Sequence, residues 1–212
     1  MRIALVGIVA VAGLASLASA NFVNPNFDTG DFQGWTRTLT VNGQSNTQVV
    51  EMVDIDGPGP LGLSNAAKFS VGRALSTPAV NGGIELTQVM SLNGGQQYTF
   101  SFDWAALRTV TTSNSQGGLF ELIVDGTVIA SGAAGSISGL TPKFGAVSGN
   151  FTPGASGFFT VGARITRPFT VPNVGGVENL FQYVDNFRPE VPAPSALALM
   201  GLGALVTGRR RR

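Results

Sequence analysis

Between residues 21 and 190, apolar side chains recur in short runs separated by Gly, Asn, Ser or Pro. The run Tyr98–Trp104 has an aromatic residue at every second position, which places its rings on one face of an extended strand. No stretch of useful length in this region has the 3.6-residue spacing of an amphipathic helix. Short strands divided by turn residues are typical of a sandwich or barrel. The pattern therefore predicts one all-β domain.

Further segments of this region also read as strands. Asp125-Gly126 separates two of them and predicts a hairpin with a type I′ turn. The predicted strands are Gln48–Val53, Ala66–Val71, Gly83–Ser91, Leu119–Val124, Thr127–Ala130, Phe144–Phe151, Gly157–Ile165 and a closing strand Val184–Phe187.

The first 20 residues have the pattern of a secretory signal peptide. Arg2 provides a positive charge, Ile3–Leu14 is an apolar run, and Ala18-Ser19-Ala20 has the small residues of a cleavage site. A bilayer-spanning helix needs about 20 apolar residues. A cleaved signal helix over residues 1–20 is therefore favoured over a retained membrane span or a buried N-terminal helix.

The composition changes after Arg188. Residues 189–194 are rich in proline and predict an extended spacer, Ser195–Gly208 is almost wholly apolar, and four arginines, Arg209 to Arg212, follow. An apolar helix followed by a basic cluster is suited to stop in a membrane. Such a helix would be only about 21 Å long, below the ~30 Å of the hydrocarbon layer. We therefore expect a transient anchor.

This tail resembles the PEP-CTERM sorting signal of bacterial exported proteins. The resemblance rests on Pro192-Ala193-Pro194, the apolar stretch and Arg209, Arg210, Arg211 and Arg212, with Ala193 where the family pattern has Glu. It implies processing by an exosortase, a link to exopolysaccharide export, and a final location at the outer cell surface or in the extracellular matrix. A plain C-terminal tail anchor is the alternative. The predicted division is 1–20 signal peptide, 21–188 β-sandwich and 189–212 spacer and sorting signal.

Charge and composition exclude several classes of function. Five of the 13 basic residues lie in the two terminal segments, which leaves eight against 12 acidic residues and a net charge near −4 between them. A basic nucleic-acid surface is therefore not supported. The chain contains no cysteine and no histidine. It consequently lacks disulfides, the commonest general base and every Ser-His or Cys-His nucleophile.

The segment Asn24–Trp35, with Phe27, Gly30 and Gly34, resembles the opening of galactose-binding-like β-sandwich domains, which include many carbohydrate-binding modules. Val184–Phe187 resembles their closing strand. The resemblance implies a single jelly-roll sandwich.

Many relatives with this fold hold a structural calcium where the first and last strands meet. The resemblance therefore implies a calcium site with Asp28 and Asp185 as ligands and Asn24 as a third. Turn capping by these side chains is the alternative.

Two tryptophans and two arginines have alternative roles. Trp35 and Trp104 are expected in the core. The alternative is that either indole is exposed and stacks on a sugar. Arg164 and Arg167 are expected at the surface near the end of a strand.

The function that these patterns favour is a non-catalytic cell-surface or extracellular-matrix protein that contacts polysaccharide. Two alternatives remain open. One is an extracellular glycoside hydrolase that uses carboxylates alone. The other is a purely structural matrix protein.

Overall fold

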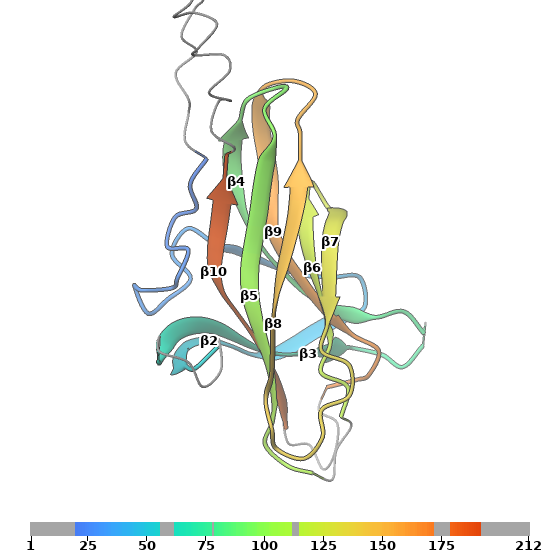
Figure 1. Ribbon diagram of the computed structural model, residues 1–212. Coiled ribbons are helices and arrows are strands. Elements are labelled where there is room, and N and C mark those ends of the chain that lie inside the picture. Colours follow the sequence, from blue (N-terminus) through green and yellow to red (C-terminus); the bar gives the residue numbers. More distant parts are fainter. Residues whose placement is uncertain (1–19, 56–61, 78, 112–114, 172–178, 192–212) are drawn as a thin grey trace, which may run out of the picture.

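The computed structural model describes residues 20–55, 62–77, 79–111, 115–171 and 179–191. This part of the chain contains ten strands (Figure 1). They are β1 (Thr36–Leu39), β2 (Gly43–Val53), β3 (Ser64–Arg73), β4 (Gly82–Leu92), β5 (Tyr98–Arg108), β6 (Leu119–Val124), β7 (Thr127–Ala133), β8 (Lys143–Phe151), β9 (Gly157–Arg167) and β10 (Leu180–Glu190).

The strands form two five-stranded sheets, and the predicted β-sandwich is confirmed. Sheet A has the order β1-β4-β9-β6-β7, and sheet B has the order β2-β3-β10-β5-β8. All pairings within the two sheets are antiparallel. The last strand, β10, lies in the middle of sheet B between β3 and β5, so the end of the domain is held by strands from its first half.

The core lies between the sheets and is rich in aromatic residues. The predicted one-sided aromatic run is observed, because Tyr98, Phe100, Phe102 and Trp104 of β5 are all buried in the same cluster. Burying a large apolar side chain contributes roughly 1.5–3 kcal/mol before entropy is counted. The alternation of β5 is therefore a major source of stability for sheet B.

The predicted hairpin between β6 and β7 is also present. Asp125 and Gly126 have φ angles of 47° and 74°. Positive φ at both central residues is the geometry of a type I′ turn, whose twist matches that of the flanking strands. The Asp125 side chain also accepts a hydrogen bond from Thr160 N at 2.8 Å, which ties the turn to β9.

Two parts of the sheets differ from the sequence-based expectation. Strand β1 was not predicted, because all four of its residues are exposed and no apolar alternation marks them. Strand β10 continues through Pro189 and Glu190, which were expected in the spacer. Pro189 is tolerated because β10 pairs with β3 only over Gln182–Val184, so its later part has a free edge.

The predicted signal peptide (residues 1–20), apart from Ala20, and the predicted apolar helix over 195–208 lie outside the described residues. Within the described part, no helix is long and apolar enough to cross a membrane.

Candidate functional site

The outer face of sheet B carries aromatic and charged side chains. On β10, Phe181, Tyr183 and Asp185 alternate with the core residues Leu180 and Val184, so they point away from the core. A second, smaller apolar cluster forms on this outer face. Its buried members are Ile55, Ala66, Ala105 and Tyr183, with Val53, Leu107, Phe144 and Phe181 partly buried against them.

A pocket of about 240 Å³ opens on this face beside β8. Ile55, Asp103, Phe144 and Gly145 line it. A half-buried aromatic ring and a carboxylate thus border one small hollow. An apolar wall with few polar groups is a lining that small-ligand sites share, and this hollow is smaller than most of them.

Asp103 retains hydrogen-bonding capacity at this pocket. Its Oδ2 accepts hydrogen bonds from Asn186 Nδ2 at 3.0 Å and Arg188 Nη2 at 2.7 Å. Its Oδ1 receives no hydrogen bond from the described residues, and the side chain is 18% exposed. An ionised carboxylate oxygen can accept more than one hydrogen bond. Asp103 can therefore receive a hydroxyl donor from a ligand.

A charged network stabilises the neighbouring part of the face. Tyr183 Oη donates to Glu51 Oε1 at 2.8 Å, and Lys68 Nζ lies 3.0 Å from Glu51. Lys68 Nζ also lies 4.1 Å from the ring centroid of Phe181. Burial, together with the bond to Glu51, raises the pKa of Tyr183. The phenol therefore stays protonated as a donor, and this network holds β2, β3 and β10 together.

Asp185 is the most deeply buried carboxyl group of this region. It lies opposite Asp103 in the β10–β5 pairing, and Ser64 Oγ donates to its Oδ2 at 3.0 Å. Burial raises its pKa to about 7, opposed by hydrogen bonds from Asn186 and Ser64 and reinforced by the charges of Asp103 and Asp28. Its Oδ1 is buried without a hydrogen-bond donor among the described residues. Such an atom calls for a proton or a cation.

Of the three predicted calcium ligands, Asp28 and Asp185 are near enough for the charge of Asp28 to contribute to the raised pKa of Asp185. Asp28 itself is exposed. Asn24 is used in its own turn, where Nδ2 donates to Thr29 Oγ1 at 2.7 Å and Oδ1 accepts from Thr29 N at 3.3 Å. Asn24 therefore caps its own turn, which is the alternative to calcium binding that the sequence offered for it. No group of three carboxylates suited to a metal occurs in the described ranges.

The orphaned Oδ1 of Asp185 and the nearby carboxylate of Asp28 are the chemistry that a hard cation would use. The two carboxylates offer oxygen ligands of the kind that calcium prefers, and they are fewer than the three charged ligands of a typical protein site. Backbone carbonyls and water would supply the other ligands, as they commonly do for calcium.

Both tryptophans lie in the core. Trp35 is 7% exposed, its Nε1 donates to Asn24 O at 3.0 Å, and its ring centroid lies 4.4 Å from that of Phe187. Trp104 is 6% exposed and stacks on Phe120 with centroids 4.6 Å apart. Neither indole presents a free ring face, so the stacking role expected as the alternative for these residues is not supported.

A second pocket, of about 490 Å³, lies on the outer face of sheet A. Glu85, Arg164 and Glu121 stand in one row across β4, β9 and β6. Arg164 Nε lies 2.8 Å from Glu85, whereas its Nη1 lies 3.8 Å from Glu121. Burial raises the pKa of Glu121, opposed by the charge of Arg164. This pocket is charged, and the residues that line it include no aromatic ring.

The surface expectation is wrong for Arg167. Its side chain is fully buried at the end of β9, where Nε donates to Gln116 O at 2.8 Å and Nη1 to Val71 O at 3.1 Å. Burial lowers its pKa to about 10, so it remains charged at neutral pH. Arg164 is at the surface, as expected.

The sequence analysis did not single out Asp103, Phe144 or Ile55. For Asp103 a signal existed, because it alternates with Phe102 and Trp104 and must point away from their face. For Phe144 the predicted strand was correct, but its pairing with Ala105 was not readable from sequence. Ile55 reaches the face from the loop after β2, which no periodicity predicts.

Comparison with known families identifies the C-terminal segment. Residues 190–212 match the family model described as the PEP-CTERM protein-sorting motif. The sorting signal predicted from Pro192-Ala193-Pro194, the apolar stretch and the arginine cluster is therefore confirmed as a sorting motif. Such a signal indicates an exported protein associated with the cell surface. A sequence comparison with curated proteins gives no match.

Solved structures with a similar arrangement of strands include carbohydrate-binding modules. One is TmCBM61 in complex with β-1,4-galactotriose, with TM-score 0.47, 18% identity, and coverage of 81% of this chain and 98% of the other. A second is the CBM22-2 xylan-binding domain of Paenibacillus barcinonensis Xyn10C, with TM-score 0.40, 15% identity, and coverage of 79% and 97%. A third is a CBM22 xylan-binding domain, with TM-score 0.43, 13% identity, and coverage of 84% and 98%.

Proposed function

We propose that the protein is a non-catalytic polysaccharide-binding protein of the outer cell surface or extracellular matrix. Its sandwich binds a sugar unit in the pocket on the outer face of sheet B. The C-terminal segment anchors it in the membrane until an exosortase-type enzyme removes the apolar stretch and the arginines. Delivery and binding are then properties of separate parts of the chain.

The observation that carries the binding proposal is the meeting of Phe144 and Asp103 at one pocket. Sugars present apolar C–H faces, which pack on aromatic rings, and hydroxyl groups, which donate hydrogen bonds to carboxylates. Phe144 supplies the ring and Asp103 Oδ1 the acceptor. The exposed guanidinium of Arg188, which is 52% exposed, stands beside Asp103 and can donate to further sugar oxygens.

Affinity electrophoresis of residues 21–190 in gels that contain different polysaccharides tests this proposal. Phe144→Ala should lower the affinity for the retained polysaccharide about tenfold, equivalent to ~1.4 kcal/mol. Glu85→Gln, on the opposite sheet, is the matched control and should bind like the unaltered protein. Retention that survives in Phe144→Ala, or uniform failure to bind any polysaccharide, would contradict the proposal.

Hydrolysis is the second candidate function, and the pocket on sheet A favours it. There burial raises the pKa of Glu121, as a general acid requires, and Glu85 forms an ion pair with Arg164 at 2.8 Å. The missing aromatic platform makes this site the weaker of the two. Release of reducing sugars that disappears in Glu121→Gln would establish this function and overturn the non-catalytic assignment.

We further propose that Asp28 and Asp185 hold a structural calcium ion beside the pocket. The support is the buried Oδ1 of Asp185 without a donor in the described part of the chain and the second carboxylate at Asp28. A cation there would fasten the loop before β1 to strand β10, and would offset the repulsion among Asp28, Asp103 and Asp185.

A further inference from the structure

Strand β10 leads from the folded domain directly into the sorting motif. Glu190 pairs with Thr99 of β5, and it is also the first residue of the matched motif. Only residues 191–194 separate it from the apolar stretch that begins at Ser195. The five Cα–Cα steps from residue 190 to residue 195 reach at most about 17 Å when fully extended. The domain is therefore tethered very close to any membrane that holds the tail.

Two turns lie at the same end of the sandwich, and we call them the tail-side turns. They are residues 93–97, between β4 and β5, and residues 152–156, between β8 and β9. They are joined by hydrogen bonds from Gly95 N to Pro153 O at 2.7 Å and from Gly94 N to Ser156 Oγ at 2.9 Å. Figure 1 shows the tail-side turns beyond the end of β10.

The reach of the tether decides where the tail-side turns lie. Gly95 precedes Thr99 by four residues, so at ~3.3 Å per residue the turn extends up to about 13 Å past the level of Glu190. With the tail extended to its limit, only about 4 Å remain between the turn and the start of the apolar stretch. Each headgroup layer is about 5–7 Å thick. A turn that reaches this full distance enters the headgroup layer unless the domain tilts.

We propose that the tail-side turns form a membrane-contact surface that rests among lipid headgroups while the tail is inserted. This inference rests on the proposed membrane stage of sorting. This contact gives the anchored domain a defined orientation, in which the end of the sandwich that carries the tail-side turns faces the membrane.

The chemistry of the tail-side turns agrees with this placement. Their sequences, Asn93-Gly94-Gly95-Gln96-Gln97 and Thr152-Pro153-Gly154-Ala155-Ser156, contain no charged residue. Phe158 follows the second turn and is 80% exposed, more than any other described phenylalanine. Apolar rings gain free energy at the boundary between headgroups and acyl chains, and uncharged turns avoid the cost of desolvating a charge.

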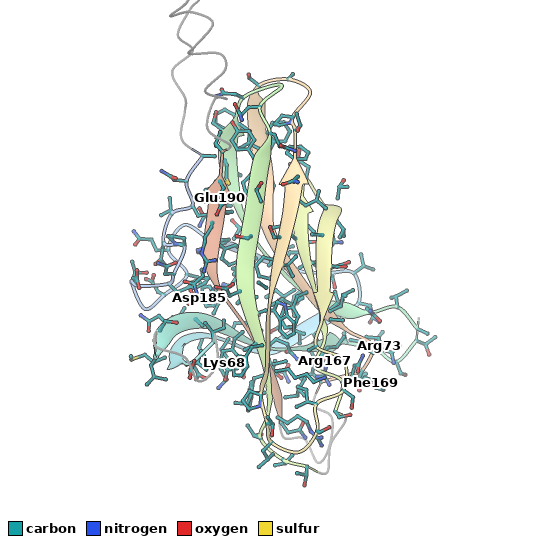
Figure 2. All side chains as sticks on the ribbon, viewed as in Figure 1. Lys68, Arg73, Arg167, Phe169, Asp185 and Glu190 are labelled. Atoms are coloured by element: carbon teal, nitrogen blue, oxygen red, sulfur yellow. The ribbon has the colours of Figure 1, made fainter. Side chains whose placement is uncertain are left out.

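The opposite end of the sandwich has a different character. Arg73 and Lys143 lie there, together with the buried Arg108 and Arg167, and Figure 2 shows Arg73 and Arg167 far from Glu190. Asp103 lies four residues along β5 from Thr99, which puts the pocket about 13 Å further from the bilayer. The proposed sugar pocket therefore stays accessible in the anchored state.

Single-cysteine variants of the full chain test the orientation, and the absence of native cysteine makes labelling specific. Ala155→Cys places a fluorophore on a tail-side turn, and Ser138→Cys places it at the opposite end; both residues are exposed. The proteins are reconstituted into phosphatidylethanolamine–phosphatidylglycerol vesicles with a nitroxide quencher on the headgroup. We expect quenching at position 155 and only the aqueous background at position 138.

A spacer of twelve Gly and Ser residues between Val191 and Pro192 is the matched control. It should abolish quenching at position 155 while the protein still floats with the vesicles. Equal quenching at the two positions, or quenching at 155 that survives the spacer, would overturn the membrane-contact surface alone. Failure of the unaltered chain to float with vesicles would instead contradict the membrane stage of the proposed function and the inference with it.

Discussion

The chemistry of the outer face of sheet B depends on a few carboxyl groups held at different depths. Asp103 is partly exposed and paired with Arg188, whereas Asp185, its neighbour across the strand pair, is fully buried. Burial and the charges of Asp103 and Asp28 disfavour ionisation of Asp185. The same strand pairing thus places Asp103 where a ligand can reach it and buries Asp185 where its carboxyl group needs a proton or a cation.

The pH dependence of stability should report on Asp185 in metal-free protein. Its pKa in the folded protein, about 7, lies above the ordinary value, so the folded state binds this proton more tightly than the unfolded chain. The resulting stabilisation is complete below about pH 4 and is lost as the pH rises through about 7. Asp185→Asn should remove this dependence, which is at most ~1.4 kcal/mol per pH unit, in urea unfolding measured from pH 4 to 8.

Calcium should act through the same residue. At pH 8, calcium added to metal-free protein should raise the melting temperature of the unaltered chain and leave Asp185→Asn unchanged. An equal rise in both proteins would place the ion elsewhere. If neither calcium nor chelator moves the melting temperature, there is no structural ion at this site.

At the scale of elements, small residues set the fit between strands and core. Gly145 of β8 lies opposite Trp104 of β5, and a Cβ at this position would come 2.5 Å from Trp104 Cζ2. A side chain here would therefore displace the indole, whose Nε1 is already buried without an acceptor in the described part of the chain. The glycine is needed for close approach.

Gly145→Ala should therefore destabilise the sandwich by about 1–3 kcal/mol, the usual cost of overpacking a core. Denaturant unfolding followed by tryptophan fluorescence measures the change. Gly154→Ala is the matched control, because its Cβ meets nothing within 4 Å and its φ is not in the left-handed region, so little change is expected. Equal stability of Gly145→Ala and the unaltered protein would show that the indole can move without cost.

The elements that could be predicted from the sequence are those in which one face is buried. The alternation from Tyr98 to Trp104 identified β5, and Asp125-Gly126 identified the hairpin, because pleat and turn chemistry are local. Strand β1 has no buried face and escaped prediction. The pocket on the outer face of sheet B could not be predicted, because Ile55, Asp103 and Phe144 come from three separate segments and only the sheet order brings them together.

At the scale of the whole molecule, the folded domain and the C-terminal tail are expected to have separate roles. The sorting motif begins at Glu190, the last residue of β10, so the folded domain leads directly into its sorting signal. The tail carries four of the 13 basic residues, so its proposed removal would leave an acidic sandwich. The proposed calcium and sugar sites lie on that sandwich and would remain after the tail is removed.

Mass spectrometry of the C-terminus of the protein purified from its native cells tests directly whether the sorting signal is removed. Processing predicts a terminus at or near residues 192–195, without the apolar stretch and the arginines, on protein recovered from the cell surface or the surrounding matrix. Full-length chains that still end in Arg212, on protein that remains in the membrane, would contradict processing and leave a plain tail anchor.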